Sequence, residues 1–227
     1  MRTTHDEPTP IRSQRRGGGA VLEETIPDIV IRRLPIYVRT LRELQSQGAT
    51  SISSDELAEQ IGVTAAQIRR DLSYFGRFGK QGKGYDAERL AEAIARILRL
   101  DRQWDVALAG FGNLGQAILH FHGFVPASFH IAAIFDRNAD AIGREVNGVV
   151  IRGAGEVTEE IARLGIKMGI IAVPTSAAQE IADAMIDGGV DAILNYAPVV
   201  LKTPARVTVR EVDPVSAMQS MTYYLDV

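Results

Sequence analysis

Apolar residues recur with helical spacing in the first part of the chain. In residues 28–47 they return every three or four positions, which predicts an amphipathic helix. Pro27 suits the start of this helix, Pro35 is expected to kink or divide it, and Gly48 is expected to end it. The polar, glycine-rich residues 1–24 lack this pattern and are predicted to form a disordered tail.

Two shorter helical stretches follow and are separated by a glycine. Ser54 is expected to cap the first and Thr64 the second, because their side chains can accept a hydrogen bond from the first turn. Gly62 is expected to adopt a left-handed conformation in the turn between them. Small Ala58 and apolar Ile68 would pack where the two helices cross. This spacing of alanine, glycine and isoleucine is typical of a DNA-binding helix-turn-helix.

A glycine-rich segment and a further helix complete this part of the chain. Residues 78–85 contain three glycines and are predicted to form a hairpin or loop rather than a helix. An apolar stripe predicts another helix over residues 87–100. Residues 25–100 are therefore expected to form a winged helix-turn-helix domain, with the hairpin as its wing.

The pattern changes at Trp104. From there, short apolar and β-branched runs alternate with helical segments or glycine-rich turns. Such strands, alternating with helices, predict a parallel sheet that is covered on both faces. Residues 101–213 are therefore expected to form a Rossmann-like parallel α/β domain, and residues 214–227 a short amphipathic helix. The predicted fold class of the chain is α/β.

Composition narrows the possible functions. The 227 residues include no cysteine, which excludes disulfides, thiolate metal sites and thiol-based redox sensing. No apolar run approaches the ~20 residues needed to cross a bilayer. The N-terminus lacks the apolar centre of a signal peptide, so a cytoplasmic protein is expected. The net charge of −3 is unevenly spread, since residues 1–85 carry 13 basic and 10 acidic side chains.

The basic excess is concentrated around the second short helix and the predicted wing. Between Arg69 and Gly84 five basic residues stand against one acidic residue, Asp71, which indicates a phosphate-binding surface. Arginine and glutamine side chains can also hydrogen-bond base edges. A solvated basic face on an interaction domain is the alternative. The candidate DNA contacts are Ser54, Thr64, Gln67, Arg69, Arg70, Ser73, Tyr74, Lys80 and Lys83.

A glycine-rich motif lies between a predicted strand and a predicted helix. In a dinucleotide-binding turn the first glycine makes the tight turn, the second lets backbone approach the pyrophosphate, and the third packs helix on strand. The start of the helix would add free N–H groups and a positive dipole for the phosphates. The motif therefore predicts a nucleotide site. Its six residues are Gly110, Phe111, Gly112, Asn113, Leu114 and Gly115.

An acidic residue and several strand ends extend this predicted site. Asp136 ends the next strand, where a carboxylate accepts hydrogen bonds from the adenosine ribose and repels a 2′-phosphate, which favours NAD(H). The adjacent Arg137 could instead accommodate that phosphate. Further candidates at strand ends are Val173, Pro174, Thr175, Asn195, Ala197 and Pro198.

The sequence favours a sensor over an enzyme. A dehydrogenase needs a proton donor or acceptor beside the nicotinamide, and Tyr196 is the only candidate at the predicted strand ends. The four histidines, His5, His120, His122 and His130, fall elsewhere, and no metal-ligand spacing occurs. No room remains for a substrate domain, so the dinucleotide is expected to be a signal rather than a reagent. An NAD-dependent oxidoreductase and a sensor of a coenzyme A derivative are the alternatives.

Four segments of the chain resemble the Rex family of redox-sensing transcriptional repressors. They read SSDELAEQIGVTAAQIRRDLSYFG, GRFGKQGKGYDAERL, GFGNLGQAIL and ILNYAPVVL, and the resemblance runs from about residue 27 to 225. It implies a homodimer with two winged helices on a palindromic operator and NAD(H) sites near the dimer interface. It further implies that rising NADH releases the repressor from double-stranded DNA.

The resemblance also implies a swapped helix and a switch. The C-terminal helix would be exchanged between subunits, whereas a helix folded back on its own domain is the alternative. Asp213 and Arg39 would couple the ligand to DNA binding, although Asp213 also suits a helix cap. The sequence departs from the family pattern at Phe121, where a tyrosine hydroxyl is expected, and at Pro214, where an apolar side chain often lies near the nicotinamide.

Overall fold

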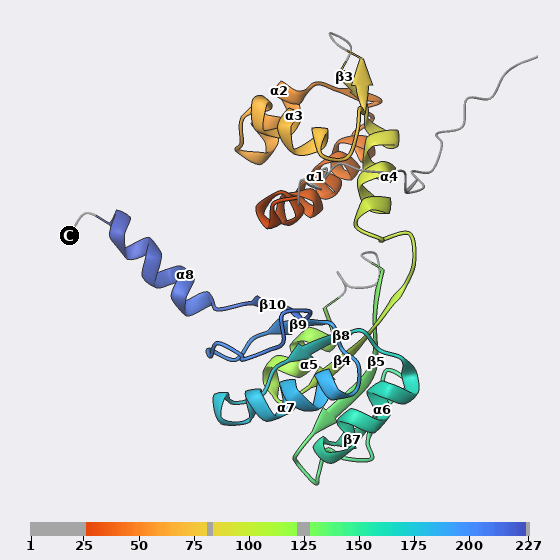
Figure 1. Ribbon diagram of the computed structural model, residues 1–227, viewed down its shortest axis with the longest axis vertical. Helices are drawn as coiled ribbons and strands as arrows, with labels where there is room; N and C mark the ends of the chain where they lie inside the picture. The colour runs from red at the N-terminus through yellow and green to blue at the C-terminus, as the bar shows by residue number, and fades with distance from the viewer. Residues whose placement is uncertain (1–25, 81–83, 122–127, 226–227) are drawn as a thin grey trace, which may run out of the picture. The chain divides into compact units, whose positions relative to one another are not determined.

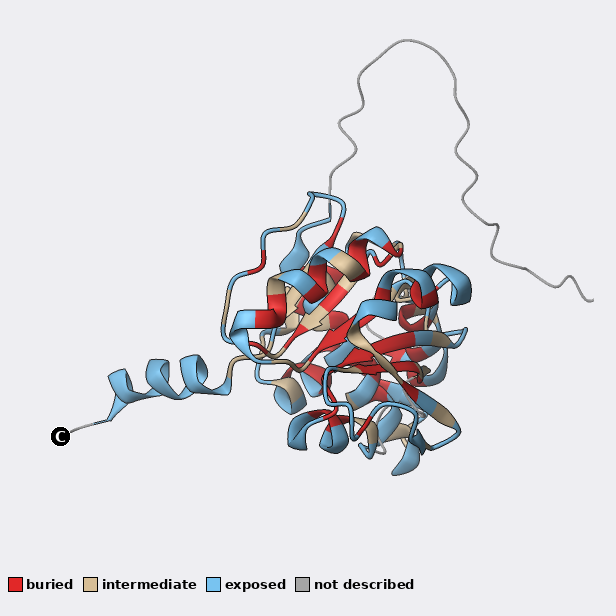
Figure 2. Ribbon diagram, turned by 90° about the horizontal axis from the view of Figure 1, so that it is seen from below, coloured by how far each residue is buried: buried red, intermediate tan, exposed pale blue. Residues whose placement is uncertain are grey.

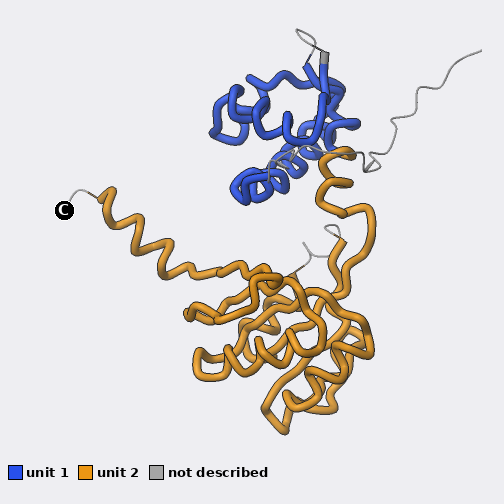
Figure 3. The backbone as a smooth tube through the Cα atoms, viewed as in Figure 1, with its two compact units in different colours: residues 1–91 blue, residues 92–227 orange. Residues whose placement is uncertain are grey.

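The computed structural model describes residues 26–80, 84–121 and 128–225. The predicted tail, residues 1–24, lies outside this range. The chain forms two compact units, residues 1–91 and 92–227 (Figure 3). The division falls inside helix α4 (Ala87–Ile97), before the domain limit at residue 100 that the apolar pattern suggested.

The first unit begins with a long helix that continues through Pro35. Helix α1 (Asp28–Ser46) buries one stripe of side chains, and Pro35 lies on its exposed face. Water can therefore satisfy the carbonyl that loses its intrahelical partner at the proline. The expected division of the helix at Pro35 is wrong, because the buried stripe, which includes Leu34 and Val38, packs on both sides of the proline.

Helices α2 (Ser54–Ile61) and α3 (Ala65–Ser73) form the predicted helix-turn-helix. Gly62 adopts the left-handed conformation with φ +76°, and Ala58 and Ile68 are both buried, as the spacing predicted. Thr64 caps α3 as expected, since its hydroxyl accepts a hydrogen bond of 3.1 Å from the backbone N–H of Gln67.

The cap of α2 is Ser53, so the expectation for Ser54 is wrong. The Ser53 hydroxyl accepts from the backbone N–H of Glu56 at 3.1 Å, and the Glu56 carboxylate accepts from the backbone N–H of Ser53 at 2.7 Å. This reciprocal capping box requires a glutamate three residues after the cap, which only Ser53 has. Ser54 becomes the first helical residue and is buried, with its hydroxyl 3.2 Å from that of Tyr85.

A small antiparallel sheet forms the wing. Its strands are β1 (Ser51–Ile52), β2 (Gly79–Lys80) and β3 (Gly84–Asp86), in the order β1-β3-β2. The hairpin prediction for residues 78–85 is confirmed, and β1 adds a strand that the sequence pattern did not predict. Lys83 lies outside the described residues, and Lys80 is described only as part of β2.

The second unit is a sheet with Rossmann topology (Figure 1). Neighbouring strands are parallel except for the edge pair β6 and β7, and the sheet order is β10-β9-β8-β4-β5-β7-β6. Numbered along the chain, the parallel strands follow the dinucleotide-binding order 3-2-1-4-5-6. The strands are β4 (Trp104–Ala109), β5 (Phe129–Asp136), β6 (Glu145–Val146), β7 (Val149–Gly153), β8 (Met168–Ile171), β9 (Ala192–Asn195) and β10 (Thr208–Glu211).

Helices cover both faces of this sheet, as predicted. Alternate residues of β4 point to opposite faces, so that Leu108 packs with α5 (Asn113–Leu119), while Ala107 packs with α6 (Val157–Leu164) and α7 (Thr175–Asp187). The short 3₁₀ helix η1 (Ala154–Glu156) leads into α6.

The C-terminal helix extends away from the sheet of its own unit (Figure 2). Helix α8 (Pro214–Met221) and the 3₁₀ turn η2 (Thr222–Tyr224) bury none of their side chains. Met218 is 67% exposed and Tyr223 86% exposed. The alternative in which this helix folds back on its own domain is therefore wrong.

None of the helices in residues 26–80, 84–121 and 128–225 is both long and apolar enough to cross a bilayer.

Candidate functional site

The glycine-rich turn lies where the order of strands in the sheet reverses direction. Gly110 follows β4 with φ +94°, and a side chain there would collide with the carbonyl of Ala172, which follows the adjacent strand β8. A side chain at Gly115 would collide with the carbonyl of Gly110. A Cβ at Gly112 would instead meet no atom within 4 Å. Two glycines thus allow close packing, while Gly112 leaves the backbone open to a ligand.

Asp136 is fixed at the mouth of this turn. One carboxylate oxygen accepts a hydrogen bond of 2.5 Å from the backbone N–H of Phe111, and the other accepts from that of Asn138 at 2.7 Å. The ends of β4 and β5 are therefore joined through a charged acceptor. Each oxygen keeps a further lone pair for a ligand hydroxyl.

A cavity of about 350 Å³ opens at these strand ends. The predicted site residues that line it are Gly110, Gly112, Asp136, Arg137, Val173 and Pro174. Residues that the sequence analysis did not select also contribute: Ala109, Phe135, Asn138, Ala154, Ala172, Ser176, Ala177 and Ile181. Their signal was only positional, because they lie at or just after strand ends or in the early turns of helices, where residue type says little about contact with a ligand.

Other predicted cofactor residues take different places around the turn. The side chain of Phe111 is buried in the sheet core, and Gly115 packs α5 on β4. Asn113 and Leu114 are exposed in the first turn of α5, and Thr175 is the first residue of α7.

Asn195 organises a loop rather than lining the cavity. Its buried amide nitrogen donates to the carbonyls of Ala197 (3.0 Å) and Val199 (2.9 Å), and its oxygen accepts from the backbone N–H of Ala197 at 3.0 Å. The expectation that the Asn195 side chain lines the pocket is therefore wrong, because its hydrogen-bonding groups are used within the loop. Ala197 is buried in the same loop, and Pro198 is exposed.

The candidate general acids lie outside the cavity. Tyr196 is half-buried and packs against the sheet core beside α5. His120 lies 2.7 Å from the carbonyl of Gln116, and His130 lies 3.0 Å from the carboxylate of Asp105; both are exposed. His5 and His122 fall outside the described residues. Within the described ranges, no group of three or more histidine or acidic side chains could hold a metal ion.

A basic groove lies between α3, the start of α2 and the wing. Its volume is about 670 Å³, and its lining includes Arg69, Ser73 and Arg77 together with Ser53 and Ser54 at the start of α2. Arg70 is exposed on the same helix as Arg69. Guanidinium groups and the free N–H groups of a helix start both favour anions such as DNA phosphates. Arg77 belonged to the basic cluster but was not selected as a contact.

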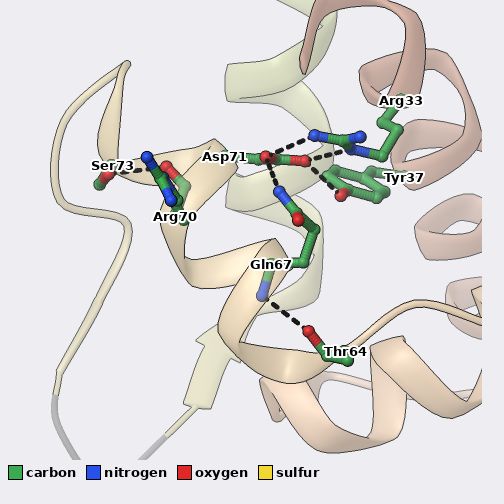
Figure 4. A network of polar contacts seen from close by, with 7 residues as sticks. All are labelled: Arg33, Tyr37, Thr64, Gln67, Arg70, Asp71 and Ser73. Atoms are coloured by element: carbon green, nitrogen blue, oxygen red, sulfur yellow. Dashed lines mark hydrogen bonds and ion pairs between the residues drawn. The ribbon is translucent and has the colours of Figure 1, made fainter. Parts of the chain in front are cut away.

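A buried carboxylate holds α3 against α1 (Figure 4). Both oxygens of Asp71 accept two hydrogen bonds: Arg33 donates at 2.6 and 2.8 Å, and Tyr37 and Gln67 donate at 2.7 Å each. All four acceptor positions of the carboxylate are therefore used. The sequence analysis missed this role, although Asp71 comes three residues after buried Ile68 and so shares its face of the helix.

This network changes the list of candidate DNA contacts. Gln67 is half-buried and its amide nitrogen donates to Asp71, so only part of the amide is available. A contact of Gln67 with DNA therefore stays a prediction. Tyr74 is also half-buried. Ser54 is buried, whereas Thr64, Arg69, Arg70 and Ser73 remain exposed. In Figure 4, Arg70 and Ser73 lie on the side of α3 opposite Asp71, and the Ser73 hydroxyl donates to the carbonyl of Arg70 at 2.7 Å.

Two family models match the chain along its length. One is described as a putative DNA-binding protein N-terminus and covers residues 25–73. The other is described as a CoA binding domain and covers residues 101–199.

Full-length relatives join the two parts. A redox-sensing transcriptional repressor Rex from Chloroflexus aurantiacus is 53% identical over 199 residues, which cover 88% of this chain and 94% of the relative. A Rex repressor from Roseiflexus is 50% identical over 89% of this chain and 92% of the relative. The chain belongs to the Rex family.

Solved structures of a Rex-family repressor, RSP, show the same architecture. RSP in complex with NAD⁺ and operator DNA is 40% identical to this chain, with a TM-score of 0.83 over 88% of this chain and 92% of RSP. RSP in complex with NADH is 37% identical, with a TM-score of 0.79 over 88% of this chain and 94% of RSP. The fold predicted from the sequence is thereby confirmed.

The three residues that the family resemblance groups into a switch occupy separate parts of this Rex-family chain. Arg39 is exposed on α1, and Phe121 is 63% exposed just after α5. Asp213 caps α8, since its carboxylate accepts from the backbone N–H groups of Val215 and Ser216 at 3.0 Å each. The capping alternative for Asp213 is therefore confirmed, while its coupling to Arg39 stays a prediction.

The charges of the Asp71 network follow from its contacts. Burial raises the pKa of Asp71, but hydrogen bonds from Arg33, Tyr37 and Gln67 outweigh it, so the pKa lies below its ordinary value. The hydrogen bond to Asp71 raises the pKa of Arg33. Burial, followed by the hydrogen bond to Asp71, raises the pKa of Tyr37 well above its ordinary value. At neutral pH the network is a buried ion pair with a neutral phenol.

Asp71→Asn is expected to lower the free energy of unfolding of the first unit by about 3–5 kcal/mol at neutral pH, because it leaves the Arg33 charge without its partner. Since the folded pKa of Asp71 is lowered, the stabilisation is complete above the unfolded pKa of about 4 and is lost as the pH falls further. Urea unfolding at several pH values, followed by amide exchange in α3, measures both effects.

Glu59→Gln is the matched control for this prediction. Glu59 is an exposed carboxylate on α2 of the same unit, and its neutralisation is expected to change stability by less than about 0.5 kcal/mol. An equal loss in Asp71→Asn at pH values above and well below 4 would show that the charge of Asp71 does not matter.

Proposed function

We propose that this chain is a transcriptional repressor that binds operator DNA through its winged helix and releases it when NADH occupies its Rossmann pocket. The observation that carries the proposal is the presence, in one chain, of an exposed basic helix beside a basic groove and a dinucleotide turn closed by Asp136. The relatives are named redox-sensing repressors, and RSP was solved with NAD⁺, NADH and operator DNA.

In this proposal the cavity of the second unit holds the adenosine and pyrophosphate part of NAD(H). The pyrophosphate approaches the backbone at Gly112 and the start of α5, where free N–H groups and the helix dipole favour anions. Asp136 accepts hydrogen bonds from the ribose hydroxyls through the lone pairs that Phe111 and Asn138 leave free. Val173 and Pro174 border the same space from the end of β8.

The DNA contacts divide into two classes. Arg70, exposed on α3, is assigned to base edges, because a guanidinium can donate two hydrogen bonds to guanine. Arg69, Ser73 and Arg77 line the groove and are assigned to backbone phosphates. Thr64 lies exposed at the start of α3 and joins the phosphate contacts.

Coupling between the ligand and DNA rests on a homodimer. The exposed apolar face of α8, with Val215, Met218 and Met221, fits the exchange of this helix between two subunits that the family resemblance implies. Asp213 at its start and Arg39 on α1 would then carry the ligand signal. Phe121 cannot supply the hydroxyl of the family pattern, so the hydrogen-bonded switch differs in this chain.

Two alternatives have separate tests, although Tyr196, the acid that an oxidoreductase would need, lies outside the cavity. The second family model is described as a CoA binding domain, which keeps a coenzyme A derivative as a competing ligand. NADH displaced by coenzyme A at equal concentrations would favour that ligand. Steady NADH turnover with a small carbonyl compound would favour an oxidoreductase, in which Tyr196 is the candidate acid. We also propose a cytoplasmic location, because a transcriptional repressor has to reach its operator DNA.

The decisive experiment titrates NADH, and separately NAD⁺, into the protein bound to a labelled palindromic operator at fixed salt. Fluorescence anisotropy is expected to fall with NADH and to stay high at the same concentration of NAD⁺. DNA that stays bound while NADH fluorescence reports an occupied pocket would show that the two functions are present but uncoupled.

Gly112→Ala is expected to weaken NADH binding roughly tenfold or more, because its methyl group would occupy the space that the pyrophosphate approaches. The fold is expected to persist, since a Cβ at Gly112 meets no atom within 4 Å. Titration of bound NADH fluorescence measures the affinity, and thermal unfolding measures the fold. Gly115→Ala is the contrasting variant and should lower the melting temperature, because its methyl group would collide with the carbonyl of Gly110. If Gly112→Ala binds NADH as tightly as the wild type, Gly112 does not belong to the site.

Arg70→Ala is expected to weaken operator binding by about 1–3 kcal/mol and to relax base preference, because a base contact is lost. Arg144→Ala removes an exposed arginine from the second unit and serves as the control, with no expected effect on DNA binding. Anisotropy titrations on the operator and on a single-base variant measure both. Loss of the same affinity on every sequence would assign Arg70 to phosphates instead.

A further inference from the structure

An ion pair lies at the edge of the dinucleotide cavity. Arg137, the first residue after β5, lines the cavity, and its guanidinium donates to the carboxylate of Glu180 at 2.9 Å. Glu180 belongs to α7, which begins beside the cavity after β8. Both side chains are reachable by solvent, with exposed fractions of 58% and 77%. The pair thus joins two elements at the cavity edge where Asp136 lies.

Two neighbouring residues at the end of β5, Asp136 and Arg137, favour different ligands. A carboxylate at the position of Asp136 favours a ribose with a free 2′-hydroxyl, whereas an arginine beside it can bind a 2′-phosphate. Asp136 is held in place by the backbone of Phe111 and Asn138. The preference of the cavity therefore depends on whether the guanidinium of Arg137 is available to a phosphate.

Glu180 determines whether the guanidinium of Arg137 is available to a phosphate. With Glu180 present, the three side chains carry two negative charges and one positive charge, and the only positive group is already hydrogen-bonded to a carboxylate. A 2′-phosphate would have to displace Glu180 from Arg137 while lying near two carboxylates. Without Glu180, one negative and one positive charge remain, and the five donors of the guanidinium can turn toward the ligand.

We propose that Glu180 is a specificity residue that keeps NADP(H) out of the cavity by holding and neutralising Arg137. This inference rests on the proposed function, because it assumes that the cavity binds a nicotinamide dinucleotide. Glu180 acts through Arg137 and does not itself contact NADH, so its removal changes the choice between NADH and NADPH rather than the affinity for NADH.

The test compares the affinities of the full-length protein for NADH and NADPH by the fluorescence of the bound nucleotide. In Glu180→Gln, NADPH affinity is expected to rise roughly fivefold, in line with the modest strength of exposed charge pairs, while NADH affinity stays within about twofold. The gain should shrink as salt is raised, because the charges are exposed.

Two further variants show whether Arg137 carries the effect. Arg137→Gln added to Glu180→Gln should abolish the gain for NADPH. Asp187→Asn makes the same charge change at the exposed last residue of α7, and it should leave both affinities unchanged.

The outcomes separate this inference from the proposed function. A wild-type protein that binds neither nucleotide would refute the proposed function itself. NADH binding with an unchanged preference in Glu180→Gln would overturn the role of Glu180 and leave the proposed function intact. Equal changes in both affinities would also overturn it, since Glu180 would then act on α7 as a whole.

Discussion

The orientation of the DNA-binding helix depends on a single buried carboxylate. Asp71 has no exposed surface, and a charge in that position is tolerated only because every acceptor position is used. Two of its partners, Arg33 and Tyr37, come from α1, so the network joins two helices that are far apart in the sequence. Arg70 and Ser73 lie on the side of α3 opposite Asp71. The Asp71 network that buries one face of α3 against α1 therefore leaves the face with Arg70 and Ser73 exposed.

In the nucleotide site, as around Asp71, hydrogen bonds hold polar side chains in fixed positions. Asp136 and Asn195 are the last residues of the parallel strands β5 and β9, and both hydrogen-bond to nearby backbone groups. Asp136 closes the glycine-rich turn and keeps lone pairs for a ligand, whereas Asn195 is buried and shapes a loop. At a strand end, backbone N–H and C=O groups no longer have partners in the sheet. Polar side chains there either hydrogen-bond to these backbone groups or bind a ligand.

The proposed sensor would couple these two sites through helix α8, which is exposed in the single chain. Helix α8 is capped firmly by Asp213, yet it buries none of its own side chains. A helix with a well-formed start and an exposed apolar face is suited to packing against a partner, since its apolar residues gain burial only there. The proposed dimer and the proposed ligand response thus depend on the same helix.

The sequence alone determined the features that depend on neighbouring residues. Periodicity predicted the helices and the parallel sheet, the spacing of Gly110, Gly112 and Gly115 predicted the turn, and Thr64 was recognised as a cap. Each of these reflects a backbone requirement within a few residues. The capping box of Ser53 could also have been predicted from the sequence, because Glu56 follows three residues later.

Only the tertiary structure decided which polar side chains face one another. Gln67 was assigned to DNA but donates to Asp71, and Asn195 was assigned to the cofactor but binds its own loop. The sequence left the role of Arg137 in cofactor choice open, and only the structure shows that Glu180 lies beside it. Residue type shows that a side chain can donate or accept hydrogen bonds, but packing of distant segments decides which partner is near, and this information is not local in the chain.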